Sequence, residues 1–214
     1  MDVWIVLVMQ LTSNISILKS AYLGKTGAIV GSGPSIINLI HDSFLGVDVV
    51  ITIDYAIARI RMLNLSMPIY TMWKDHGPLK GTPDGVCNPC PGQPPCTNRC
   101  IKLSPQSPEI YVVHVHESEH CNEQYSPRYI FDNNQFGHHW GKPSVVPSIE
   151  IMRLFGVVDL KMMGFDSITS GSKQTCRDGL TAISLLDGCA YPAHALIIKD
   201  LLSRCTFKSV EFIK

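Results

Sequence analysis

Apolar, β-branched runs alternate along this chain with stretches of helical length. The first runs cover residues 27–30, 47–53 and 68–73, and each ends at glycine or at polar residues. Short continuous apolar runs predict strands that are buried on both faces, as in a parallel sheet. Stretches of helical length, 34–44 and 56–63, separate them. The alternation predicts an α/β domain.

The second half of the chain repeats this order. Residues 144–155 have a helical pattern, 157–163 a strand pattern, and Gly164-Phe165-Asp166 reads as the turn at the carboxyl end of that strand. Pro147 must then lie in the first helical turn, where proline is tolerated. An apolar helical run follows over residues 195–202. We therefore expect a three-layer, Rossmann-like α/β domain with a mostly parallel sheet and a Cys-rich inserted loop.

The length and the net charge of the chain limit the classes of protein to which it can belong. The 214 residues suit a single domain over 1–214, and 18 basic against 18 acidic residues leave no net charge. Such a balance gives no electrostatic reason to expect a nucleic-acid partner. The apolar residues 3–9 are too short to span a bilayer and follow Asp2 rather than a basic region. We expect no transmembrane segment and a cytoplasmic location, and the sequence leaves a homo-oligomer open.

The turn after the first strand is the strongest motif. It reads Gly31-Ser32-Gly33-Pro34-Ser35. Glycines allow positive φ and a close approach of the backbone to a ligand, and proline suits the first position of a helix whose free N–H groups attract an anion. The motif predicts a phosphate-binding turn for a nucleotide. It lacks the third glycine of the dinucleotide fingerprint and the Lys-Ser/Thr pair of a P-loop, and a plain turn capped by serine is the alternative.

Acidic residues follow three of the predicted strands. They are Asp54, Asp75 and Asp166. Because the carboxyl ends of parallel strands share one edge, these carboxylates are expected to meet a ligand there. The alternatives are a helix cap for Asp54 and, for Asp166, a turn aspartate that hydrogen-bonds its own backbone.

The order of these motifs resembles a known superfamily. Gly-Ser-Gly-Pro-Ser is followed by Asp54, by a helix that Ser144 opens and Leu154-Phe155-Gly156 ends, and by Gly164-Phe165-Asp166. This order is similar to the bacterial lipooligosaccharide sialyltransferases. Their wider family includes the archaeal 6-hydroxymethylpterin pyrophosphokinase and many phage proteins. The resemblance covers roughly residues 25–75 and 137–214.

The resemblance implies an inverting, nucleotide-dependent glycosyltransferase with a sugar-nucleotide donor, most simply a CMP-sugar, and a carbohydrate acceptor. Ser32 and Asp54 stand where those enzymes carry a small residue, usually asparagine, and this departs from their cytidine-binding pattern. By resemblance, the donor-binding positions are Gly31, Ser32, Gly33, Pro34, Ser35, Asp54, Asp75 and Ser144.

The resemblance also implies catalytic residues. His194 occupies the place of the family's general base, a task that suits a side chain with a pKa near neutrality; an ordinary histidine at a helix start is the alternative. Tyr191 would donate a hydrogen bond to the leaving phosphate, and Asp166 or Asp54 would orient sugar hydroxyls. The family's pair of tyrosines is not visible at its usual spacing.

Two other functions fit the same residues. A pyrophosphokinase acting on a pterin-like alcohol would gather Mg²⁺ with Asp54, Asp75 and Asp166 against the phosphates of ATP. A non-catalytic nucleotide-binding or assembly protein, as a phage might carry, would keep the fold without turnover.

Residues 76–130 form a Cys-, Pro- and His-rich segment that we interpret as an insertion within the domain. Two close pairs of cysteines favour a structural zinc site built of four thiolates. Two disulfides are the alternative in an oxidising compartment, and free thiols are the third reading. The four cysteines are Cys87, Cys90, Cys96 and Cys100.

Histidines lie on both sides of the end of this segment. His114 and His116 would share one face of a strand and could bind metal, although a solvated or core-edge face is the more ordinary interpretation. His138, His139 and Trp140 precede the helix at Ser144 and are the second-choice site residues. Near the end of the chain, Cys205 is expected in the core.

Overall fold

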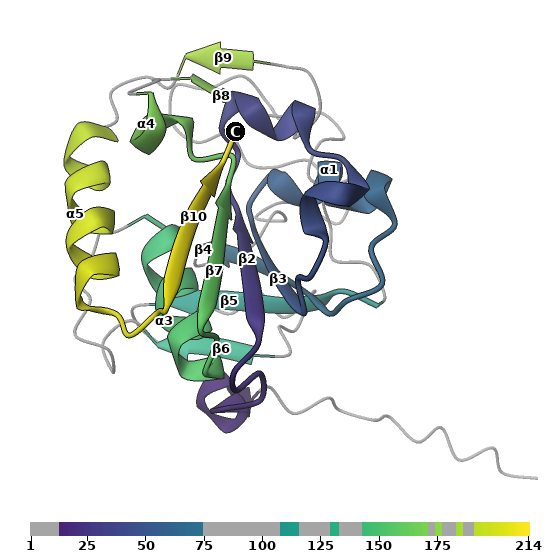
Figure 1. Cartoon of the computed structure of the whole chain (residues 1–214), viewed down its shortest axis with the longest axis vertical. Helices are drawn as coiled ribbons and strands as arrows, with labels where there is room; N and C mark the ends of the chain where they lie inside the picture. The colour runs from purple at the N-terminus through teal and green to yellow at the C-terminus, as the bar shows by residue number, and fades with distance from the viewer. Residues whose placement is uncertain are drawn as a thin grey trace, which may run out of the picture.

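The structure is a computed structural model that describes residues 13–74, 108–115, 129–132, 143–170, 174–176, 183–185 and 191–214. Its centre is an eight-stranded sheet in the order β1-β6-β5-β4-β3-β2-β7-β10 (Figure 1). Neighbouring strands are parallel throughout. The strands are β1 (Ser13–Asn14), β2 (Thr26–Val30), β3 (Val49–Ile53), β4 (Ile69–Lys74), β5 (Ile110–Val115), β6 (Tyr129–Asp132), β7 (Asp159–Met163) and β10 (Ser209–Ile213).

Helices cover both faces of this sheet, so the expected three-layer α/β architecture is confirmed (Figure 1). One face carries α3 (Val145–Phe155) and α5 (Tyr191–Arg204), and the other carries α1 (Ala56–Leu63). The shorter elements are the 3₁₀ helices η1 (Ile15–Leu18), η2 (Pro34–Asn38) and η3 (His41–Phe44), the single-turn helix α4 (Asp166–Thr169), and the strands β8 (Gln174–Cys176) and β9 (Ile183–Leu185), which pair antiparallel.

Alternate residues along the central strands pack into two hydrophobic cores, one on each face of the sheet. Ile29, Ile51 and Met162 pack on the side of α3 and α5, whereas Val30 and Val50 pack on the side of α1 and η2. All five residues of β3 are buried. Burial on both faces explains why the central strands appear in the sequence as continuous apolar runs.

The stretch 34–44 is not the single helix that its length suggested. It forms η2 and η3, separated by Leu39 (ψ 132°) and Ile40 (ψ 170°), whose backbones are extended. The Leu39 carbonyl accepts hydrogen bonds from Nε and Nη2 of Arg59 on α1, at 3.1 and 2.5 Å. A side chain from α1 therefore takes the carbonyl that a continuous helix would have used.

Two further boundaries differ from the expectations. Tyr191 and His194 belong to the first turn of α5 instead of preceding the helix, with Pro192 second in the helix, where proline is tolerated. Within the expected insertion over 76–130, residues 110–115 form β5 between β4 and β6, so this part belongs to the sheet. Residues 75–107 and 116–128 lie outside the described part of the chain.

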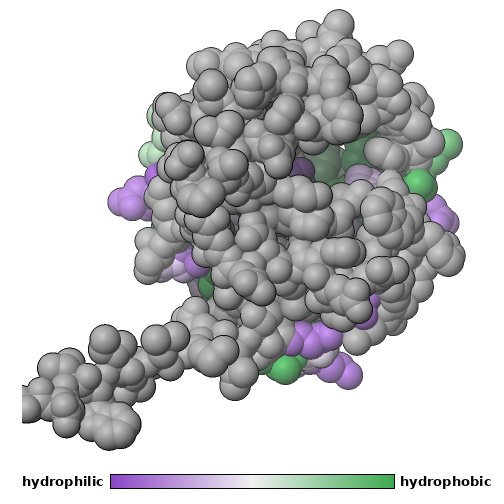
Figure 2. Space-filling view, turned by 180° about the vertical axis from the view of Figure 1, so that it is seen from behind, coloured by the Kyte–Doolittle hydropathy of each residue, from purple (hydrophilic) through white to green (hydrophobic). Residues whose placement is uncertain are grey.

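In the view from behind, both hydrophilic and apolar atoms of the described residues are visible between the grey ones (Figure 2). Leu23 and Leu196, which are 71% and 70% exposed, are the most exposed of the large apolar side chains described. Among the described residues, no helix has the length and apolar character needed to cross a bilayer.

Candidate functional site

The strand order reverses between β2 and β7. The chain adds β3, β4, β5 and β6 in turn on one side of β2, and then places β7 and β10 on the other side. In open α/β sheets, ligands bind beyond the carboxyl ends of the strands at such a reversal. In Figure 1 the carboxyl ends of β7 and β10 point to the top of the molecule, where α4, β8 and β9 also lie. We take this carboxyl edge as the candidate site.

Two glycine turns meet at the reversal. The Gly31 N–H donates to the Met163 carbonyl and the Gly33 N–H to the Gly164 carbonyl, each at 2.8 Å. A Cβ on Gly31 would lie 2.9 Å from the Gly164 oxygen, and one on Gly33 would lie 2.5 Å from it. Gly164 has a positive φ of 70°, whereas Gly33 has an ordinary φ of −66°. Gly31 and Gly33 are therefore required for contact between the turns, not for an unusual backbone conformation.

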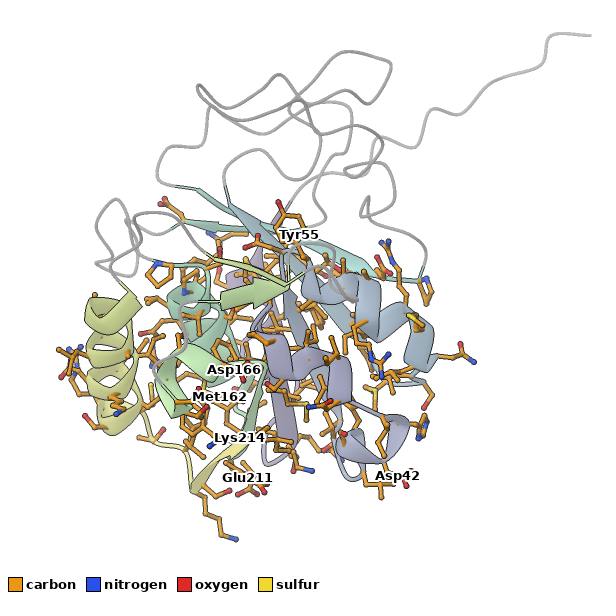
Figure 3. All side chains as sticks on the ribbon, turned by 90° about the horizontal axis from the view of Figure 1, so that it is seen from above. Asp42, Tyr55, Met162, Asp166, Glu211 and Lys214 are labelled. Carbon is orange, nitrogen blue, oxygen red and sulfur yellow. The ribbon has the colours of Figure 1, made fainter. Side chains whose placement is uncertain are left out.

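The carboxylate of Asp166 links the same two turns. Asp166 opens α4, and its Oδ2 accepts the Ser35 N–H at 3.1 Å and the Ser35 hydroxyl at 2.8 Å. Figure 3 looks down on this edge and labels Asp166. The turn thus donates its N–H groups at Gly31, Gly33 and Ser35 to protein acceptors. A phosphate bound at Ser35 would have to displace the Asp166 carboxylate.

Asp54 lies one strand away on the same edge. It follows β3 with a φ of 49°, a left-handed conformation that is uncommon for residues other than glycine. Its N–H donates to the Met72 carbonyl at 3.1 Å and so continues the pairing of β3 with β4. The residue that caps α1 is Tyr55, whose side chain makes no capping hydrogen bond. Asp54 therefore lies one residue before the N-cap position of α1.

Two helices begin at this edge. Because α3 leads into β7 and α5 into β10, both parallel to β2, each helix starts at the carboxyl edge. Ser144 precedes α3 and is 8% exposed, and its carbonyl accepts the N–H and the hydroxyl of Ser148 at 3.2 and 2.8 Å. The backbones of Tyr191 and His194 lie in the first turn of α5, which contacts α4.

Several predicted site residues lie outside the described part of the chain. Among the residues described, no group of three or more His, Cys, Asp or Glu side chains could hold a metal ion. The side chains of His114, Tyr191 and His194 lie outside the description. The residues outside it altogether are Asp75, Cys87, Cys90, Cys96, Cys100, His116, His138, His139 and Trp140.

Three polar residues near this edge were not predicted from the sequence. Asp132 ends β6, so its backbone lies at the carboxyl edge. Thr52 on β3 and Thr71 on β4 are fully buried register partners, and within the described structure neither hydroxyl has a hydrogen-bond partner. A signal for Thr52 existed, since it is the single polar residue of the strand Val-Val-Ile-Thr-Ile.

Comparison of the chain with protein-family models, with curated proteins and with solved structures found no match. The relationship to sialyltransferases and pyrophosphokinases stays a prediction from the motifs.

Proposed function

We propose that this chain is a nucleotide-dependent transferase, and within that class a glycosyltransferase that takes its sugar from a sugar nucleotide. The observation that carries the proposal is the reversal of strand order between β2 and β7, with two glycine turns in contact there. Polar residues from β3, α3 and α4 lie at the same edge. Nucleotides are the ligands that such reversals bind most often in doubly wound sheets.

The two described carboxylates suit the hydroxyl groups of the donor. A carboxylate offers about four acceptor positions, so Asp166 can hold Ser35 through Oδ2 and still accept a sugar hydroxyl. Asp54 follows the strand next to the glycine turn, where an acidic residue accepts from ribose in related folds. The donor phosphates would then lie away from Asp166, toward Ser144 and the start of α3, because a helix N-terminus favours negative charge.

The proposed reaction is a single displacement. His194, in the first turn of α5, takes the proton of an acceptor hydroxyl as general base. The hydroxyl oxygen then bonds to the anomeric carbon of the sugar as the bond from that carbon to the phosphate oxygen breaks, and the configuration inverts. Tyr191 donates a hydrogen bond to the leaving phosphate.

The test is a thermal-shift screen of the full chain with CMP, CDP, UDP, GDP, AMP and ATP, each with and without Mg²⁺. Ligands that bind the native state raise its melting temperature. A shift with CMP, or with another product of a sugar-nucleotide donor, that needs no metal supports the proposal. A shift with ATP alone that requires Mg²⁺ would favour pyrophosphoryl transfer, and no shift with any nucleotide would overturn nucleotide binding.

Variants locate the ligand. Asp166→Asn keeps a side-chain oxygen for Ser35 and removes the charge, so it should weaken the stabilisation by the bound nucleotide if the carboxylate holds a hydroxyl. A stronger shift in this variant would instead place a phosphate beside residue 166. Asp159→Asn is the matched control, because Asp159 begins the same strand, β7, at the opposite edge. His194→Ala should retain nucleotide binding and lose turnover.

A further inference from the structure

Two buried hydroxyls lie side by side within the sheet. Thr52 on β3 and Thr71 on β4 are register partners, and both are 0% exposed. Alternation along β3 places Thr52 on the same face as Val50, the face that α1 covers. Ala56, Ile57 and Ile60 are the buried residues of α1 on this face.

Neither hydroxyl has a partner within the described protein. Oγ1 of Thr52 and Oγ1 of Thr71 are both buried without a hydrogen bond. A buried hydroxyl in this condition is costly, and native proteins keep few of them. Valine has nearly the shape of threonine and is likewise enriched in strands, yet both positions carry threonine. Two neighbouring buried hydroxyls in an apolar layer therefore indicate a polar molecule that hydrogen-bonds to both.

We infer that Thr52 and Thr71 together bind one internal water molecule beneath α1. A buried water needs two to four polar partners, typically about three, and two hydroxyls on adjacent strands supply two. Each hydroxyl can donate or accept, so one water satisfies both. The apolar residues of α1 on this face offer no side-chain hydrogen bond that would compete.

The test is a double-mutant cycle on the full chain with Thr52→Val, Thr71→Val and the double variant, followed by urea denaturation. If one water bridges the two hydroxyls, each single valine substitution removes one of the hydrogen bonds of that water and leaves the remaining hydroxyl poorly satisfied. The urea midpoint of each single variant should therefore fall. The double variant then lies no lower than the worse single variant, because removing both partners leaves nothing unsatisfied.

Three outcomes overturn the inference. A urea midpoint that rises with each valine substitution shows that the hydroxyls have no partner at all. Decreases in the midpoint that add up in the double variant show a separate partner for each hydroxyl. Unchanged midpoints show that no bound water contributes to stability. If a valine variant fails to fold, ¹⁷O relaxation dispersion compares Thr52→Ala, which lacks the hydroxyl, with Thr52→Ser, which keeps it. Thr52→Ser is expected to hold as many long-lived internal waters as the parent protein, and Thr52→Ala one fewer. Equal numbers of long-lived waters in the two variants contradict the hydroxyl site.

Discussion

Replacing Gly33 by alanine tests the contact on which the candidate site depends. The added Cβ would lie 2.5 Å from the Gly164 carbonyl oxygen and would overlap Oδ2 of Asp166. The Asp166 side chain could rotate away, but the Gly164 oxygen belongs to the backbone of the other turn. The two turns would therefore have to separate.

The separation can be worked out from the same distances. Ordinary van der Waals contact begins at 3.4 Å, so the turns must move apart by about 0.9 Å from the 2.5 Å contact. The 2.8 Å hydrogen bond from Gly33 to Gly164 would then exceed hydrogen-bond length. Loss of that bond, weakening of the two bonds from Ser35 to Asp166, and overpacking together cost about 2–4 kcal/mol. For a chain of this size the melting temperature should fall by about 4–16 °C.

The assay is urea and thermal unfolding followed by far-ultraviolet circular dichroism. Gly46→Ala is the control, because Gly46 has a φ of 74° and open space around its Cα. Alanine at Gly46 should cost about 1 kcal/mol through backbone strain alone. Both variants change the unfolded chain equally. A Gly33→Ala variant no less stable than Gly46→Ala would refute the close contact between the turns.

Two further predictions concern charge. Arg61 on α1 binds Glu109 through two hydrogen bonds of 2.6 and 2.7 Å, and the Glu109 side chain is 6% exposed. Arg61→Ala should lower the free energy of unfolding, measured in urea, by about 3–5 kcal/mol because a buried carboxylate loses an ion pair and the two hydrogen bonds of the guanidinium. Burial, followed by the charge of Glu150, raises the pKa of the Cys205 thiol above its ordinary 9.0. The unfolded chain then loses this proton first, so the contribution of Cys205 to stability is present below pH 9.0 and is lost as the pH rises through the raised value.

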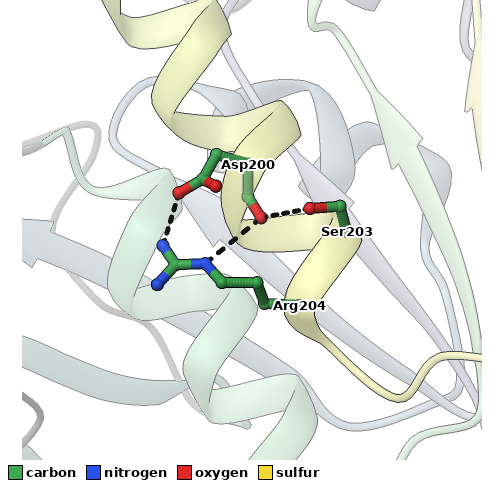
Figure 4. Close-up of polar contacts among 3 residues, drawn as sticks. All are labelled: Asp200, Ser203 and Arg204. Carbon is green, nitrogen blue, oxygen red and sulfur yellow. Dashed lines mark hydrogen bonds and ion pairs between the residues drawn. The ribbon is translucent and has the colours of Figure 1, made fainter.

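Each of these predictions has a control. Arg204 makes a comparable ion pair with Asp200, but their side chains are 69% and 62% exposed (Figure 4); Arg204→Ala should therefore cost less than about 0.5 kcal/mol. Equal losses in the two arginine variants would contradict the role of burial. For Cys205, the stability of Cys205→Ser should fall less steeply with pH above 9.0 than that of the parent protein. Parallel pH curves would show that the thiol does not contribute.

The local pattern of apolar residues predicted the strands that are buried on both faces of the sheet. The runs that became β2, β3, β4 and β7 lie in the middle of the sheet. Most of their residues are apolar because elements pack on both faces of the sheet there. The helix α3 was also predicted from its local sequence, since Pro147 lies in its first turn and Gly156 ends it with a φ of 78°. The three-layer class followed from the alternation of such elements.

Contacts between distant parts of the chain could not be predicted from the sequence. Asp166 and Ser35 are 131 residues apart. Both were expected at the ligand edge, but no local pattern predicts that they bind each other. The break between η2 and η3 depends on Arg59, which the sequence gives no reason to place on the Leu39 carbonyl. The partnership of Thr52 with Thr71 requires the register of β3 against β4. Sequence patterns report periodicity and burial, whereas these contacts depend on topology.

The pairing of β2 also sets when the carboxyl edge can form during synthesis. One neighbour, β3, follows closely, but the other, β7, reaches the ribosome exit only after most of the chain has been made. Until then the Gly31–Ser35 turn has no Met163, Gly164 or Asp166 to receive its hydrogen bonds. A nascent chain that ends before β7 would expose one edge of β2, and unpaired strand edges promote association between chains. Completion of the ligand edge and protection of β2 from aggregation are therefore the same late folding event.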